Sequence, residues 1–318
     1  MYKLRFAKAL IRGMATYVPA ASPLFPNRTG GTDSVRYCYS CWLRHLFMAR
    51  RNGVTTAFDT VAELGPGDSL GVGLAALISG ARTYYGLDVY KYADPGRNLE
   101  MFDGLVELFR RREPIPQEDA SMAPRLDSYG FPYFAFEEKA LEAALEDARI
   151  DRLRDNLRDF EGPDCPVRYI VPWEDPSVIA AGSIDMLLSQ AVLELVPSLQ
   201  SAYRAMYAWL KPGGHMSHQI DFSDPRTSAK WNGNWTHSDF VWSCLRGKRA
   251  HWGNREAHSA HIRFLQEAGF QVVCDLTTRN YTGAPKRRIA RRFHHLSDDD
   301  LTTSEAFILA KRPVCRVS

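Results

Sequence analysis

The chain has 318 residues, of which 45% are hydrophobic, and its formal net charge at pH 7 is +3. This length can form one large domain with additional segments. The net charge is too small to require an anionic partner for the protein as a whole. No apolar stretch is long enough to span a bilayer, and the six cysteines do not form a disulfide framework. We therefore expect a soluble, cytoplasmic protein with reduced cysteines.

Residues 1–18 have the pattern of a basic amphipathic helix. Four apolar side chains share one side and three basic ones the other: Phe6, Leu10, Met14 and Tyr17, against Arg5, Lys8 and Arg12. The basic residues interrupt any apolar core that a secretory signal would need. The favoured interpretation is a helix packed on its own domain, and the alternative is peripheral contact with anionic lipid at the inner membrane surface.

A second helical pattern covers residues 32–51, and together the two form a helical cap over residues 1–52. Cys38 and Cys41 make a C-x-x-C motif within it. A zinc ribbon would need a second close pair of cysteines, which the sequence lacks. We expect ordinary buried thiols and no metal.

The stretch ELGPGDSLG, residues 63–71, joins an expected strand at 60–64 to a helical run. A phosphate-binding P-loop would need a lysine there, and none is present. A dinucleotide loop, G-x-G-x-x-G, is matched by Gly65 and Gly67, but Leu70 stands at its third position. The glycines therefore indicate a tight strand-to-helix turn that does not fit either phosphate motif.

Acidic residues on both sides of this turn indicate what it holds. Glu63 precedes the glycines and Asp68 lies among them, where it would repel a pyrophosphate. Two carboxylates suit a cofactor that has positive charge and no phosphate. S-adenosylmethionine (SAM), with its sulfonium and ammonium groups, is such a cofactor. About 20 residues further on, a second apolar strand ends at Asp88, a position from which an acid can bind ribose hydroxyls.

The rest of the chain alternates helices and strands. Residues 92–163 are longer than a simple crossover needs and contain two helical runs, 99–112 and 137–160, so we expect a helical insertion. A further helix at 259–268 is closed by Gly269. The remaining strands are expected at 167–173, 184–189, 215–220, 270–276 and 306–311. We expect the fourth of the seven strands to run directly into a helix, and a tight Pro-Gly-Gly turn before the fifth.

Four blocks, ELGPGDSLG, GLDVY, SIDMLLSQAVLE and WLKPGGHMSHQID, occur in this order. In them the chain resembles the class I SAM-dependent methyltransferases, from about residue 60 to 310. The resemblance implies an α/β fold with a Rossmann-like seven-stranded sheet, helices on both faces and an antiparallel last pair. It places the methyltransferase domain at 53–312, with insertions at about 92–163 and 222–257 and a tail at 313–318.

The resemblance also implies a cofactor site. Gly65 and Gly67 let the backbone approach the methionine part, Glu63 orients the loop and favours the ammonium, and Asp88 takes the ribose hydroxyls. In this fold an N-terminal helix often closes over the cofactor, so three residues are lid candidates, with plain packing as the alternative: Arg36, Tyr37 and Tyr39.

The adenine and the sulfonium are expected further along the chain. Trp173 and Glu174 follow the third strand and match the family's adenine-side residues; Trp173 stacks on the ring or fills the core. Ser189 and Gln190 end the fourth strand and face the sulfonium. Many relatives read L-E-H next, whereas this chain reads Leu193-Glu194-Leu195, so it lacks that histidine.

The candidate general bases for an acceptor hydroxyl lie where the fifth strand ends, His218 and Asp221. Three positions apart, they point to opposite faces of a regular strand, so at most one faces the acceptor. We favour Asp221, which lies nearer the carboxyl end. The alternative for His218 is a hydrogen-bonded histidine in the core.

A tryptophan-rich insertion follows, with four of the seven tryptophans between positions 231 and 252. Flat rings beside polar side chains suit a sugar, which makes Trp235, His237 and Asn254 substrate candidates. The equal alternative is a lid with its own small aromatic core. His258 and His261 could share a helix face, but no carboxylate partner stands beside them and we expect no metal.

Among class I enzymes the chain most resembles bacterial methyltransferases of surface polysaccharide or lipopolysaccharide biosynthesis. The resemblance rests on YCYSCWLRHL, VAELGPGDSLGVGLAAL, KPGGHMSHQIDF, WNGNW and LSDDDLTTS. It implies a sugar or similar polar small molecule as methyl acceptor.

Two other classes remain open. The first is a SAM-binding protein without catalysis, against which the two candidate bases argue. The second is a nucleic-acid methyltransferase that uses the basic run Lys286–Arg292 as a phosphate-binding patch. The acidic residues Asp298–Asp300 follow that run and would offset its field, and the chain lacks the [DN]-P-P-[YF] motif of amide-base methylation. We therefore expect no nucleic-acid partner.

Overall fold

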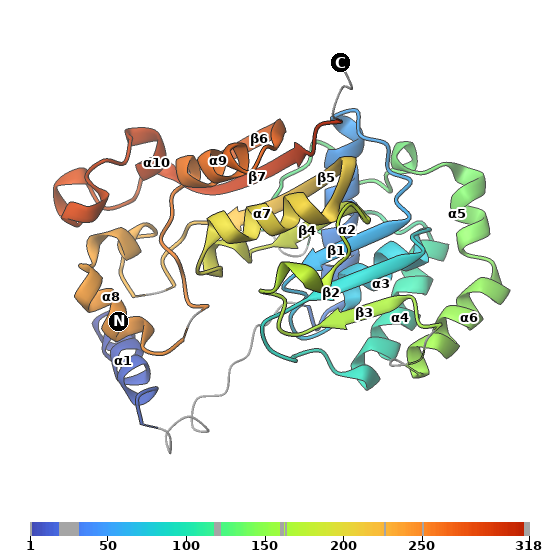
Figure 1. The fold of residues 1–318 in the computed structure, drawn as a ribbon, viewed down its shortest axis with the longest axis horizontal. Helices are drawn as coiled ribbons and strands as arrows, with labels where there is room; N and C mark the ends of the chain where they lie inside the picture. Colours follow the sequence, from blue (N-terminus) through green and yellow to red (C-terminus); the bar gives the residue numbers. More distant parts are fainter. Residues whose placement is uncertain are drawn as a thin grey trace.

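The computed structural model describes residues 2–18, 32–117, 122–159, 162, 164–225, 227–249 and 251–314. Its centre is one seven-stranded sheet with the strand order β3-β2-β1-β4-β5-β7-β6 (Figure 1). The strands are β1 (Thr60–Leu64), β2 (Thr83–Leu87), β3 (Val167–Ile170), β4 (Ile184–Gln190), β5 (Leu210–Asp221), β6 (Gln271–Arg279) and β7 (Thr303–Lys311).

Strands β1 to β5 are parallel, and β7 runs antiparallel between β5 and β6. The chain reverses its direction across the sheet between β1 and β4, which places a topological switch point at their carboxyl ends. The expected Rossmann-like seven-stranded α/β sheet with an antiparallel last pair is confirmed by this topology.

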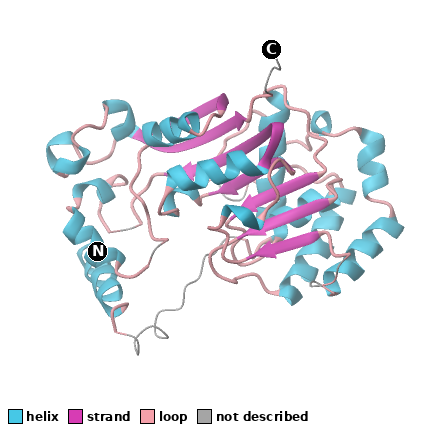
Figure 2. Ribbon diagram, viewed as in Figure 1, coloured by secondary structure: helices cyan, strands magenta, loops and turns pink. Residues whose placement is uncertain are grey.

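Helices cover both faces of the sheet (Figure 2). The described helices are α1 (Tyr2–Ala15), α2 (Val35–Arg51), α3 (Gly71–Ile78), α4 (Pro95–Arg110), α5 (Glu138–Ala144), α6 (Asp147–Arg158), α7 (Leu199–Trp209), α8 (Asp239–Arg246), α9 (His258–Glu267) and α10 (Asp298–Thr302). Helices α2, α3 and α4 contribute to one apolar core, and α7 and α9 to the core on the other face. Because β1 and β4 are covered on both sides, nearly all of their residues are buried, the polar Glu63 and Ser189 included.

Three expected boundaries differ from the structure. The chain after β4 forms only a short 3-10 turn, Leu193–Leu195, and α7 begins after Pro197, with the Ser198 side chain accepting from the Ser201 N–H. The Pro-Gly-Gly segment lies inside β5, which starts directly after α7, rather than in a turn before it. Strand β3 ends at Ile170, before Pro172, which has no N–H to donate.

The cap is only partly as expected. Helix α2 packs on α3, and α1 packs on α8 rather than on the sheet. Met14 and Tyr17 were expected on the packed side of α1, but both are about half exposed. Parts of the cap (residues 19–31) and of the tail (315–318) lie outside the described residues. Among the helices that the structure describes, none has the length and apolar character needed to cross a bilayer.

Candidate functional site

A cavity of about 510 Å³ opens at the carboxyl ends of β1, β2 and β4. Its walls come from the loop after β1, the loop after β2, the segments after β3 and β4, the start of α2 and the segment after α8. The lining residues used below are Tyr37, Glu63, Gly65, Gly67, Asp88, Val89, Tyr90, Trp173, Gln190, Val192, Arg249, His251 and Trp252. The cavity therefore lies where the topology of the sheet favours ligand binding.

A second cavity, of about 710 Å³, opens at the opposite edge of the sheet. Phe58 and Asp59, which directly precede β1, are among its lining residues, together with Trp42 and Arg149. It contains none of the predicted site residues, so the smaller cavity is the candidate functional site.

The glycine loop forms one wall of the site. Gly65 and Gly67 have φ values of +67° and +75°, in the left-handed region that favours glycine. A Cβ atom on Gly65 would come within 2.6 Å of the Val192 side chain. The Gly65 N–H donates to the Leu87 carbonyl, at 2.7 Å. The backbone angles of the two glycines thus give the loop its shape, and both glycines line the cavity.

Glu63 lies at the base of this loop and is 2% exposed. Its carboxyl oxygen accepts a hydrogen bond of 2.6 Å from the Tyr84 hydroxyl. Burial raises the pKa of Glu63 to about 8, although the Tyr84 hydrogen bond opposes the shift. A buried carboxyl of this kind gains stability in its charged form when a cation lies beside it.

Asp88 follows β2 on the next wall and is 5% exposed. Its carboxylate accepts from the backbone N–H groups of Gly67, at 3.3 Å, and Val89, at 2.7 Å. Burial raises the pKa of Asp88, and these backbone donors oppose the rise. These two backbone N–H groups therefore hold the Asp88 carboxylate in place at the cavity wall.

Of the two residues predicted to lie beside the adenine, Trp173 and Glu174, one lines the cavity. Trp173 lines it and packs edge-on against Trp209, with ring centroids 6.2 Å apart. Glu174 lies outside the lining but within 3.5 Å of His251, which lines the cavity. Glu174 thus reaches the site through His251.

The two residues predicted at the end of β4 also differ in whether they line the cavity. Gln190 lines the cavity, and its side chain hydrogen-bonds to His45 at 3.2 Å and donates to the Ala123 carbonyl at 2.9 Å. Ser189 points the other way, is fully buried and hydrogen-bonds to His218 at 2.7 Å. Successive strand residues face opposite sides, so Ser189 lies away from the expected sulfonium position.

Of the three lid candidates on α2, Tyr37 lines the cavity. Arg36 pairs with Glu113 at 3.1 Å, and Tyr39 is fully buried with its hydroxyl donating to the Glu113 carbonyl. The Cys38 and Cys41 side chains are also buried and form no disulfide. No group of three His, Cys, Asp or Glu side chains suited to a metal occurs within the described ranges.

His218 is placed where a general base cannot work. It is fully buried in the core on the α7 and α9 side of β5, and burial lowers its pKa to about 3. This placement contradicts the expected catalytic role and matches the core alternative. Asp221, at the end of β5, is partly exposed and accepts from the Ser223 N–H at 2.8 Å. It lies outside the cavity lining, near the same edge of the sheet.

The three substrate candidates of the insertion hold the insertion together. Trp235 is fully buried in a small core, and its indole N–H donates to the Arg255 carbonyl at 2.9 Å. His237 stacks against Trp242, and Asn254 donates to the Leu193 and Val196 carbonyls. None of the three lines the cavity, and their polar atoms bind the protein itself, so these positions do not support the predicted contact with a substrate.

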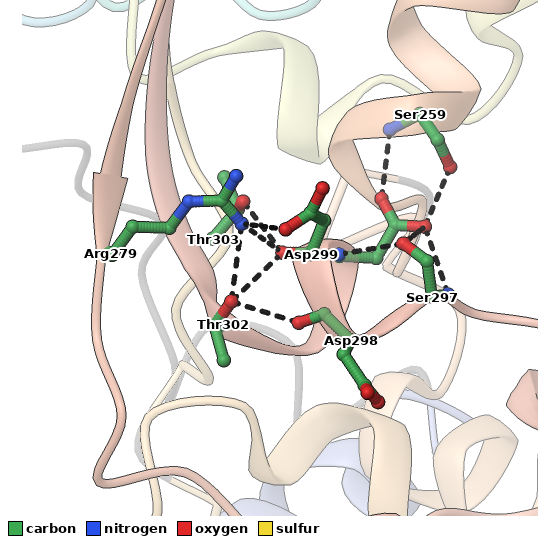
Figure 3. A network of polar contacts seen from close by, with 8 residues as sticks. Ser259, Arg279, Ser297, Asp298, Asp299, Thr302 and Thr303 are labelled. Atoms are coloured by element: carbon green, nitrogen blue, oxygen red, sulfur yellow. Dashed lines mark hydrogen bonds and ion pairs between the residues drawn. The ribbon is translucent and has the colours of Figure 1, made fainter.

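The basic run at 286–292 forms two short 3-10 turns, and none of its residues lines the cavity. Arg292 pairs with Asp239, and Lys286 donates to the Leu296 carbonyl. The acidic triplet that was expected to offset the field of this run forms the first turn of α10 (Figure 3). Asp300 and Ser297 form a capping box, Asp300 also accepts from Ser259, and Asp299 pairs with Arg279.

Sequence reasoning missed the wall formed by Arg249, His251 and Trp252, after α8. The Arg249 guanidinium lies 4.6 Å from the centre of the Trp252 ring. A weak signal existed, since these residues belong to the tryptophan-rich insertion. Which tryptophan reaches the cavity depends on how the insertion folds.

No family model matches the chain, and no curated protein matches its sequence. Solved structures with a similar course include a putative S-adenosylmethionine dependent methyltransferase from Listeria monocytogenes, 15% identical with a TM-score of 0.41, covering 86% of this chain and 97% of that one. Another is an S-adenosylmethionine dependent methyltransferase from Mesorhizobium loti, 13% identical with a TM-score of 0.41, covering 89% and 100%. A third is phosphoethanolamine N-methyltransferase 2 from Haemonchus contortus in complex with S-adenosyl-L-methionine, 12% identical with a TM-score of 0.42, covering 88% and 57%. Likeness at these values concerns the fold alone, and the function has to be argued from the cavity.

Proposed function

We propose that the protein is a SAM-dependent methyltransferase. The observation that carries this proposal is the pair of buried carboxyl groups, Glu63 and Asp88, on the two sides of an open glycine loop at the switch point of the sheet. A loop that offers carboxylates in place of a lysine suits a cation without phosphate. The buried Glu63 carboxyl and the open backbone at Gly65 both fit an ammonium-bearing ligand.

Each part of SAM has residues to hold it. Glu63 and the loop at Gly65 and Gly67 would bind the methionine part, and Asp88 would accept from the ribose hydroxyls. Trp173 and Val89 would flank the adenine, with Gln190 on the sulfonium side. When bound, SAM supplies an electrophilic methyl group. The chain's part in the transfer is then to align the acceptor and exclude water.

The proposed acceptor is a hydroxyl of a sugar or cell-surface glycan precursor, handled in the cytoplasm. Support comes from Trp252, whose flat ring lines the cavity, and from Arg249 beside it. A ring of this kind suits the apolar face of a sugar, and a guanidinium suits a phosphate or carboxylate that the precursor carries. Asp221 is the proposed base for the hydroxyl proton.

Asp88→Ala tests the cofactor part of the proposal. The change removes the acceptors for the ribose hydroxyls, and we expect SAM binding to weaken by about 1.5–3 kcal/mol, the range for charge-assisted hydrogen bonds. Calorimetry measures this, with Asp275→Ala on β6 as a carboxylate control outside the site. Unchanged affinity in the Asp88 variant, or no SAM binding by the native protein, would sink the proposal.

Glu63 makes cofactor binding depend on pH. With a pKa of about 8, the carboxyl is mostly protonated at pH 7, and a cation bound beside it favours deprotonation. We expect SAM affinity to rise as the pH increases from 6 to about 8, with up to one proton released per SAM bound at pH 7. Calorimetry in buffers of different ionisation enthalpy counts the protons. If the Glu63→Gln variant released the same number of protons on binding SAM, the protons would come from another group.

One observation favours a second candidate, a SAM-binding protein without catalysis. His218 is buried away from the cavity and Asp221 lies outside its lining, so no predicted base faces the ligand directly. SAM binding without turnover against nucleotide sugars and envelope glycans would support this candidate. The nucleic-acid alternative lacks such support, because no residue of the basic run lines the cavity.

A further inference from the structure

Helix α1 presents an apolar stripe to solvent. Leu4, Ile11, Met14 and Val18 are between 50% and 64% exposed. Leu4 and Ile11 are seven residues apart and share one side of α1, with Met14 next to them. Val18 lies in the turn that follows the helix. Single exposed apolar residues are ordinary, whereas a continuous stripe of this kind marks an interaction surface.

The stripe cannot turn inward, because the other side of α1 is already packed. The Phe6 ring lies 5.5 Å from the His237 ring, and Leu10 is partly buried. At Gly13 the helix comes so close to α8 that a Cβ atom would collide with the backbone of Cys244 and Leu245. Helices α1 and α8 lie side by side (Figure 1), and the stripe faces outward.

The charge around the stripe has one sign. Helix α1 contains four basic residues and no acidic one: Lys3, Arg5, Lys8 and Arg12. At 3.6 residues per turn, Lys3 borders the stripe on one side and Lys8 on the other, and both are exposed. The neighbouring end of α8 adds Arg246 and Lys248, which are also exposed. The Lys248 N–H donates to Thr16 at 2.8 Å, so the two groups of charges form one surface.

We propose that the outward face of α1, with the end of α8, binds the surface of an anionic lipid bilayer. Apolar side chains bordered by lysine and arginine fit a membrane interface, where the first enter the acyl boundary and the second contact the phosphates. Charge complementarity selects this occupant, since a second copy of the same basic face would repel it.

Binding of this kind would bring the candidate active site close to the lipid. The segment that follows α8 carries Arg249 and Trp252, which line the cofactor cavity. The same segment therefore belongs to the docking surface at one end and to the cavity at the other. The bilayer-bound protein can take a methyl acceptor held at the membrane surface, which extends the proposed function.

The test is flotation of the purified protein with vesicles of phosphatidylcholine alone or with 30% phosphatidylglycerol, about one anionic lipid in three. We expect binding to the anionic vesicles only, weakening as salt rises. Ile11→Glu should lower the affinity about 10-fold or more, because an apolar anchor becomes an anion. Lys3→Gln with Lys8→Gln should lower it about 10-fold to 30-fold.

The control is Tyr281→Glu, at an aromatic side chain that is 80% exposed outside α1, and it should bind vesicles like the native protein. Circular dichroism of every variant reports folding, and SAM binding by the native protein tests the cofactor proposal separately. Failure of the native protein to float with anionic vesicles would overturn the inference. A native dimer that dissociates in the Ile11→Glu variant would also overturn it, since a second copy would then cover the stripe.

Discussion

Gly65→Val is expected to abolish SAM binding, with a loss of affinity of about 100-fold or more. The residue has a φ of +67°, which costs a non-glycine residue about 1–3 kcal/mol. A Cβ atom there would also lie 2.6 Å from the side chain of Val192, which packs against Gly65 and also lines the cavity. The loop would have to move, and the ammonium position beside Glu63 would be lost. Calorimetry or equilibrium dialysis with SAM measures the effect.

Gly182→Val is the matched control for this experiment. Its φ of +64° is nearly the same, but a Cβ atom there has open space around it, and the residue lies before β4. The control should lose a similar amount of stability through backbone strain and keep its SAM affinity. Equal losses of affinity in the two variants would mean that the glycine loop does not hold the cofactor.

Asp221→Asn is expected to slow methyl transfer by about 10²–10⁴-fold and to leave SAM affinity nearly unchanged. The substitution keeps the size of the side chain and removes its ability to take a proton. Asp221 lies opposite Glu305 on β7 and close to Glu194, and it is the partly exposed carboxylate at the end of β5. Burial raises the pKa of Glu194 and of Glu305, and the nearby Asp221 carboxylate adds to both shifts.

The measurement is a turnover assay at saturating SAM with an acceptor that the native protein methylates. Asp275→Asn on β6 is a matched control, since this carboxylate accepts from His258 on the surface side of α9, at 2.9 Å. Full activity in a folded Asp221→Asn protein would exclude the residue as the base. The transfer would then depend on positioning by the cavity wall at Gln190 and Trp252.

The half of the cavity at the glycine loop could be predicted because its determinants are local. Gly65 and Gly67 occupy a turn whose backbone angles only glycine adopts readily, and such a requirement is visible in the sequence. Glu63 and Asp88 end neighbouring parallel strands, so their separation along the chain already implies a common edge of the sheet. The placement of these four residues in one cavity follows from those two facts.

The acceptor half could not be predicted, because burial depends on contacts between distant segments. His218 is buried since β5 lies between β4 and β7 and is covered by α7 and α9, none of which the motif itself specifies. Trp235 and Trp252 belong to the same aromatic insertion, yet one fills a small core and the other lines the cavity. Both residues are tryptophans of one segment, and only the packing of the insertion gives them different surroundings.

The sequence by itself thus determined the order and type of the strands, the turn after β1 and the acids beside it. These depend on hydrophobic periodicity and on the backbone angles of single residues, both of which act over a few positions. The tertiary structure alone decided which polar side chains of β4 and β5 face the ligand, which aromatic ring closes the cavity, and which side of α1 remains in solvent. Those properties depend on which surfaces meet when distant segments fold together. Only these contacts determine which side chains are removed from water and gain the free energy of burial.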